Sequence, residues 1–172
     1  DPVLGVDMAS TGEVGAIGAH FDDALLTSML AVGYRVPKKN IMVSSGGTKS
    51  KVDLLDACRL LRKNNFNLFA TGGTQKFLEE NEVESTFVAW PDDMDAPLRV
   101  DDMIANKEFD LIINIPKNLT ERELTNGYRI RRGAIDNNIP LITNARLASA
   151  FIKAFCRITQ DDIEIKHWGE FL

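Results

Sequence analysis

The turn between residues 71 and 74 has the residue types of an anion-binding site. It lies in the stretch NLFATGGTQKF, where an apolar run leads into Thr71, Gly72, Gly73 and Thr74. Adjacent glycines at the start of a helix let backbone N–H groups approach an anion closely, and the helix dipole favours negative charge there. The two hydroxyls add hydrogen-bond donors. A tight turn with one threonine as N-cap explains the same residues equally well, so the turn alone leaves both interpretations open.

Further polar side chains follow other apolar runs of the sequence. SSGGTKSK (44–51) offers a second glycine pair with Lys49 and Lys51, although it lacks the spacing of a Walker A loop. A glycine turn with solvated lysines explains that stretch as well. Trp90 precedes a proline at the end of another run. An indole at such a position is usually part of the core, but it can also form a flat wall for a ligand.

The most apolar run, LIINI (111–115), contains Asn114, an amide that has little reason to be there unless it holds a loop or a ligand. Lys117 follows closely. Asn126 precedes the pair Arg131 and Arg132, which is most simply the solvated face of a helix. Each of these residues has a structural explanation of its own, and their convergence would favour a small anionic ligand.

The sequence shows no set of residues typical of catalysis or metal binding. His20 and His167, the only histidines, lie in the terminal segments, away from the candidates above. The aspartates of WPDDMDAPLRVDDM (90–103) are better explained by a solvated acidic loop than by a general base. GAIGAH (15–20) does not match the dinucleotide motif. We therefore expect a binding site with no catalytic residue, no metal and no cofactor of its own.

An alternation of apolar runs and amphipathic segments predicts the elements that position these residues. Strands are expected at 41–45, 66–71, 84–90, 109–115 and 139–143. Helices are expected at 20–33, 49–65, 74–81, 98–107, 121–138 and 145–155. This order predicts an α/β fold, a three-layer αβα sandwich with a five-stranded, mostly parallel sheet. Ligands bind beyond the carboxyl ends of such strands, where the candidate residues fall.

Two local patterns add finer predictions. DDIEIKHW (161–168) alternates between apolar and polar residues like an additional edge strand. Gly127 predicts an irregularity within its helix, because glycine is a poor helix former.

Composition excludes several classes of protein. The chain has 172 residues, a net charge of −5 and an isoelectric point near 5.1, which argues against general nucleic-acid or membrane-surface binding. No apolar run approaches the roughly 20 residues that span a bilayer, and the first residues do not form a signal peptide. Cys58 and Cys156 are expected to be buried free thiols in a reducing compartment. A cytoplasmic, soluble protein is therefore expected.

Several segments resemble carbamoyl phosphate synthetase large chains. MASTGEVGAIG (8–18) is similar to the segment that closes their second ATP-grasp half. GYRVPKKNIMVS (33–44) resembles the entry into their C-terminal regulatory domain, and LFATGGT, VAWP, LIINIPKN and YRIRRGAIDNNIPLITN follow in that domain's order. The resemblance implies that residues 1–18 end an ATP-grasp domain and that 19–40 form a connecting helix and linker. Residues 41–172 would form a methylglyoxal-synthase-like allosteric domain.

The resemblance also implies a function. In that family the domain is not catalytic but binds an effector and changes the activity of the ATP-grasp halves, its partners in the same chain. Those halves make carbamoyl phosphate from bicarbonate, ATP and ammonia for arginine or pyrimidine biosynthesis, with Mg²⁺ or Mn²⁺. The ammonia usually comes from glutamine through an amidotransferase subunit or domain.

The effector implied by the resemblance is of two kinds. Urea-cycle members bind N-acetylglutamate through residues that match Thr71, Thr74, Trp90, Asn114 and Asn126 by position. Lys117 and the glycine pair depart from that pattern and favour a phosphate. We therefore expect a nucleotide monophosphate such as UMP or IMP, with N-acetylglutamate as the alternative. A stand-alone methylglyoxal synthase is the alternative of another class, although residues 90–103 lack its GGDQ-like segment.

Overall fold

The computed structural model describes residues 11–116, 120–164 and 166–171. Its five strands are β1 (Asn40–Ser45), β2 (Asn67–Thr71), β3 (Thr86–Val88), β4 (Leu111–Ile115) and β5 (Leu141–Ile142). The α-helices are α1 (Phe21–Ala31), α2 (Thr48–Lys63), α3 (Gly72–Glu80), α4 (Val100–Ala105), α5 (Glu121–Asp136) and α6 (Ala145–Arg157). Two 3-10 helices follow, η1 (Gln160–Asp162) and η2 (Trp168–Phe171).

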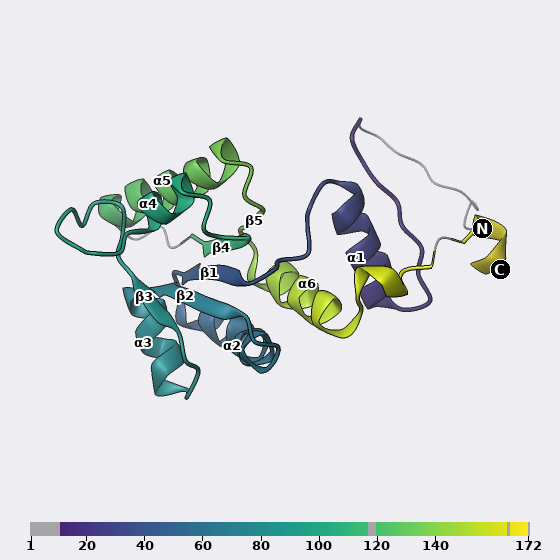
Figure 1. Ribbon diagram of the computed structural model, residues 1–172, viewed down its shortest axis with the longest axis horizontal. Helices are drawn as coiled ribbons and strands as arrows, with labels where there is room; N and C mark the ends of the chain where they lie inside the picture. The colour runs from purple at the N-terminus through teal and green to yellow at the C-terminus, as the bar shows by residue number, and fades with distance from the viewer. Residues whose placement is uncertain (1–10, 117–119, 165, 172) are drawn as a thin grey trace.

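The strands form one sheet in the order β3-β2-β1-β4-β5, and every neighbouring pair is parallel. Helices α4 and α5 cover one face, while α2, α3 and α6 lie on the other, with α1 packed against α6 (Figure 1). The predicted α/β fold with a five-stranded sheet between two helical layers is therefore confirmed.

Alternation along the central strands divides the core between the two faces. Val43 and Ile113 point toward α2 and α6, whereas Met42 and Ile112 point toward α4 and α5. All four side chains are at most 1% exposed. Because the central strands are buried on both faces, they appear in the sequence as continuous apolar runs.

The segment after α1 fastens that helix to the sheet. Gly33, at φ +94°, follows the end of α1 in the left-handed conformation, and the Tyr34 amide donates to the Met29 carbonyl. The Tyr34 hydroxyl then donates to the Leu141 carbonyl at 2.7 Å, and its ring packs edge-on against Phe151. The edge strand β5 is thereby partly covered by residues that precede the sheet in sequence.

Two local predictions are wrong. The segment 161–168 forms no strand in its described residues: it begins within η1 and ends at the start of η2. Asp162 accepts hydrogen bonds from both the amide and the hydroxyl of Thr159, which turns the chain where a strand was expected. Gly127 does not interrupt its helix, because α5 is continuous from Glu121 to Asp136.

Both cysteines are free thiols, as predicted, although only Cys58 is fully buried and Cys156 is half-buried. Burial raises the pKa of the Cys58 thiol to about 12 and that of Cys156 to about 11. Both therefore remain protonated and unreactive at neutral pH.

Candidate functional site

The carboxyl ends of β1, β2 and β4 surround a cavity of about 200 Å³. Ser44 and Ser45 line it from the end of β1, Thr71 from the end of β2, and Asn114 from β4. Strands β2 and β3 lie on one side of β1 in the sheet, whereas β4 and β5 lie on its other side. The cavity thus lies near the reversal of strand order, where open α/β sheets bind ligands. Its size suits a compact ligand, since drug-sized ligands occupy about 300–1,000 Å³.

The N-terminus of α3 contributes to this cavity without a side-chain cap. Thr71 occupies the N-cap position but makes no capping hydrogen bond, and its hydroxyl donates to the Ser44 hydroxyl at 2.9 Å. The first N–H groups of a helix have no partner within the helix, so a bound ligand can accept hydrogen bonds from them. The capping explanation of this turn therefore does not account for Thr71.

The two glycines of the turn face different neighbours. A Cβ on Gly73 would lie 3.4 Å from Nζ of Lys51, whose ammonium donates to the Gly73 carbonyl at 2.5 Å. A Cβ on Gly72 would instead lie 3.7 Å from the ring of Phe87. Gly73 and Lys51 line the cavity together, whereas Gly72 is not among the lining residues.

Ser45 carries a buried hydroxyl that lines the cavity. The residue is 6% exposed, and its Oγ has no hydrogen-bond partner within the part of the chain that the structure describes. Its backbone is fully engaged, because the Thr74 hydroxyl accepts from the Ser45 amide at 2.9 Å and donates to its carbonyl at 3.3 Å. Thr74 therefore holds Ser45 in place, while the Ser45 Oγ remains available to a bound group.

Arg131 brings a second cation to the cavity. Its Nη1 donates to the Asn114 Oδ1 at 2.7 Å, which gives this buried amide oxygen a partner and fixes the guanidinium. A Cβ on Gly127 would lie 3.0 Å from the same nitrogen, so this glycine gives the arginine room. The interpretation of Arg131 as part of a solvated face is therefore wrong. Arg132 does lie on that face, paired with Asp136.

The structure brings most of the predicted site residues together. Lining residues among them are Lys51, Thr71, Gly73, Thr74, Trp90 and Asn114. Gly72, Lys49 and Asn126 are not in the lining: Lys49 is exposed, and Asn126 is buried. Lys117 lies outside the described residues. Ser44, Ser45 and Arg131 were not predicted, although the position of both serines at a strand end was a usable signal.

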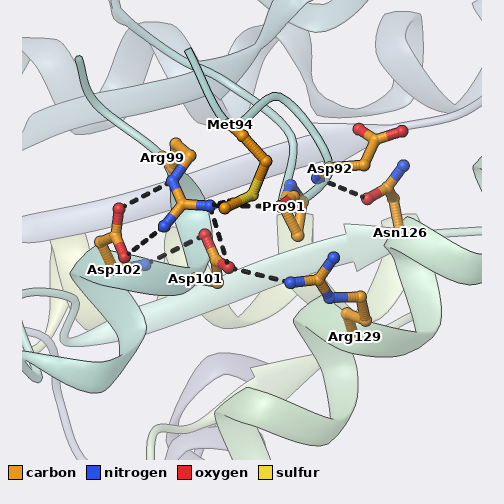
Figure 2. A network of polar contacts seen from close by, with 8 residues as sticks. All are labelled: Pro91, Asp92, Met94, Arg99, Asp101, Asp102, Asn126 and Arg129. Carbon is orange, nitrogen blue, oxygen red and sulfur yellow. Dashed lines mark hydrogen bonds and ion pairs between the residues drawn. The ribbon is translucent and has the colours of Figure 1, made fainter. Parts of the chain in front are cut away.

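The side of the cavity formed by Trp90 is held by contacts between the following loop and α5. Arg122 lies over the Trp90 ring, 5.6 Å from its centroid, and binds both carboxylate oxygens of Asp92. Asn126 accepts a hydrogen bond from the Asp92 amide at 3.2 Å (Figure 2). Arg99, just after the same loop, contacts the Pro91 carbonyl at the start of the loop.

Arg99 is the centre of a second group of contacts (Figure 2). It forms two hydrogen bonds with the carboxylate of Asp102 and lies 3.7 Å from Asp101, which in turn pairs with Arg129 of α5. The Met94 sulfur also accepts from Arg99 at 3.0 Å. These contacts join loop 91–97, α4 and α5, so the wall beside Trp90 is part of a connected layer.

The Asp92 carboxyl is expected to titrate at unusually low pH. Its hydrogen bonds with Arg122 lower its pKa to about 2, against the opposing effect of partial burial. Because the folded-state pKa lies below the ordinary value of about 3.9, the pair stabilises the fold above that pH, and the contribution is lost as pH falls toward 2. Carboxyl-carbon NMR would measure this titration, and Arg122→Met should return it to the ordinary range. A midpoint near 4 in the unmodified protein would contradict the pairing.

Neither a metal site nor a membrane-spanning helix is found in the described part of the chain. No three histidine, cysteine, aspartate or glutamate side chains are grouped to hold a metal ion there. No helix there is long and apolar enough to cross a membrane. The lining includes one carboxylate among the described residues, Glu123, whereas Asp92, Asp101 and Asp102 are held in ion pairs outside it.

A match to a protein-family model shows which family this chain belongs to. The model described as "MGS-like domain" matches residues 53–143, which run from α2 to just beyond β5. The chain belongs to the MGS-like domain family. The matched part of this MGS-like domain includes the α3 turn, Trp90, Asn114 and Arg131, while Ser45 and Lys51 precede it.

Two relatives show how this MGS-like domain occurs in longer proteins. Multifunctional protein ura1 of Schizosaccharomyces pombe is 40% identical over 163 residues, which are 91% of this chain and 7% of that protein. The human mitochondrial carbamoyl-phosphate synthase [ammonia] is 37% identical over 158 residues, 90% of this chain and 10% of that protein. The chain thus spans a small fraction of the relatives that it matches.

A solved structure is also similar, at lower identity. Methylglyoxal synthase from Elizabethkingia anophelis NUHP1 is 19% identical, with a TM-score of 0.45 and coverage of 78% of this chain and 90% of that one.

Proposed function

We propose that this MGS-like domain is the regulatory domain of a carbamoyl phosphate synthetase and that its cavity binds a small anionic effector. The parent enzyme would be a ligase that makes carbamoyl phosphate from bicarbonate, ATP and ammonia, using ATP with Mg²⁺ or Mn²⁺ in its ATP-grasp domains. Glutamine would supply the ammonia through an amidotransferase. Similarity over 90% of the chain to a carbamoyl-phosphate synthase supports this assignment.

The observation that carries the binding proposal is the buried Oγ of Ser45, which has no partner among the described residues, beside a helix N-terminus for which these residues provide no side-chain cap. Lys51 and Arg131 add two cations to the same cavity. Hydroxyl and backbone donors together with cations suit an anion, because each supplies hydrogen-bond donors toward negative charge. With one carboxylate and two cations among the described charged residues that line it, the cavity favours an anionic occupant.

Two features favour a nucleotide monophosphate over N-acetylglutamate. Because Gly73 has no side chain, its backbone and the Lys51 ammonium lie close together. This arrangement suits the three terminal oxygens of a phosphate. Trp90 supplies an aromatic surface in the lining, which suits a base. Binding there would tighten the contacts of loop 91–97 with α5 and so change the surface that this domain presents to the ATP-grasp domains.

Calorimetric titration of the 172-residue chain with UMP, IMP and N-acetylglutamate in parallel tests the proposal. Saturable binding of UMP or IMP, competed by inorganic phosphate, is the expected result. Binding of N-acetylglutamate alone would keep the regulatory function and reject the nucleotide. Binding of none of them, by a chain whose thermal melt shows that it is folded, would contradict an effector site in this domain.

A further inference from the structure

Trp90 is among the residues that line the cavity, whereas Arg122 is not. The Arg122 side chain is 65% exposed. Its guanidinium nevertheless lies over the Trp90 ring, 5.6 Å from the centroid. A guanidinium at this distance is attracted by the negative face of the indole. The arginine therefore contacts the indole from outside the cavity.

Arg122 is itself held in one orientation. Its Nε and Nη2 donate to the two carboxylate oxygens of Asp92, at 2.5 and 3.1 Å. A two-point contact of this kind fixes the plane of the guanidinium, which a single ion pair does not. Asn126 completes the arrangement, because it accepts from the Asp92 amide and donates to the Arg122 carbonyl at 3.1 Å.

We propose that Arg122 positions the indole of Trp90 as a preformed wall for a planar ring of the ligand, and that Asp92 positions Arg122. The inference rests on the proposed function and deepens it, since it names an aromatic base as the part of the ligand that meets Trp90. With Arg122 on one face of the indole, the ligand ring stacks on the face toward the cavity. Stacking of this kind is worth roughly two- to tenfold in affinity.

The test compares UMP with ribose 5-phosphate, which has the same anionic end but no base. The ratio of their dissociation constants measures the contribution of the base. We expect the unmodified chain to prefer UMP by roughly two- to tenfold. Arg122→Met should bring the ratio close to one and leave the affinity for ribose 5-phosphate unchanged, because Arg122 does not line the cavity. Asp92→Asn should reduce the ratio less.

Arg132→Met is the matched control. It removes an arginine from the same helix that pairs with Asp136 and does not line the cavity. This variant should keep the full preference for UMP. A thermal melt of each variant shows whether it is folded at the temperature of titration.

A second measurement follows the indole without any ligand. Trp168→Phe leaves Trp90 as the only tryptophan, and its time-resolved fluorescence anisotropy then reports the motion of this one ring. In that background we expect the ring to rotate with the whole protein. Adding Arg122→Met should introduce a fast local component, whereas Arg132→Met should not.

The outcomes separate this inference from the proposed function. If the chain binds both phosphates but shows no preference for UMP, or if the preference survives Arg122→Met, the inference is overturned while the anion site stands. If neither phosphate binds, the nucleotide part of the proposed function fails, and the stacking with it. An indole equally rigid with and without Arg122 would overturn the positioning role by itself.

Discussion

Arg131→Met is expected to weaken binding of a phosphate ligand by about tenfold to about a hundredfold. Arg131 is the one arginine among the described residues that line the cavity, and the Asn114 Oδ1 fixes it at 2.7 Å. A hydrogen bond to a charged group is worth about 1.5–3 kcal/mol, which corresponds to that change in affinity. Calorimetric titration with UMP and with inorganic phosphate measures the loss.

Arg132→Met is again the control, because it removes the neighbouring arginine and changes the net charge by the same amount. It should alter affinity less than about twofold, since exposed charges are screened by solvent and salt. Because Arg131→Met also deprives Asn114 of its donor, Arg131→Lys provides a second test with the charge retained. Equal affinity in the unmodified, Arg131→Met and Arg132→Met chains would remove Arg131 from the site.

Thr74→Val is expected to lower the free energy of unfolding by about 1–3 kcal/mol. The hydroxyl of Thr74 accepts from the buried amide of Ser45, and valine keeps the shape of the side chain but leaves that amide without an acceptor. An unsatisfied buried donor costs about this much. For a chain of 172 residues, each kcal/mol lowers the melting temperature by roughly 2–4 °C. Urea denaturation should show a lower midpoint with an unchanged slope.

Thr71→Val is the comparison for this prediction. The Thr71 hydroxyl donates to the Ser44 hydroxyl, and Ser44 lines the cavity, where water can replace the lost partner. We therefore expect a smaller loss of stability from Thr71→Val than from Thr74→Val. If Thr74→Val instead keeps its stability and loses phosphate affinity, its hydroxyl serves the ligand rather than Ser45.

The class of the fold was readable from the sequence because its signals are local. LIINI is a continuous apolar run since β4 is buried on both faces, and each run is followed by an amphipathic segment long enough to return along the sheet. Strand ends were also readable, so the turn at Thr71 and the amide of Asn114 were found. The boundaries of β3 and β5 were less accurate, because both are short edge strands with few partners.

The orientation of side chains was harder to predict. Arg131 and Arg132 are adjacent in sequence and look alike, yet one turns into the cavity and the other toward solvent. The difference depends on Gly127 and Asn114, which are close to Arg131 only after folding. The roles of Thr71 and Thr74 could not be predicted either, because their hydroxyl groups bind residues of β1. For Thr74 this partner, Ser45, lies 29 positions earlier in the sequence. The strand expected at 161–168 was wrong for the converse reason: the sequence alternates as a strand does, but no strand pairs with the described residues of this segment.

The connection that leads into β1 is held at the amino ends of the strands, whereas the cavity lies at their carboxyl ends. Asp110 accepts hydrogen bonds from the amides of Lys39 and Asn40 at 2.7 and 2.8 Å, at the amino ends of β1 and β4. Tension applied through this connection would therefore load the rigid sheet and leave the cavity undistorted. Conversely, a ligand that pulls on loop 91–97 acts on α4 and α5, at the other end of the sheet from residue 39. In mechanical terms the sheet separates this connection from the cavity, so a signal from a ligand in the proposed site would leave over the outer helices rather than along the chain.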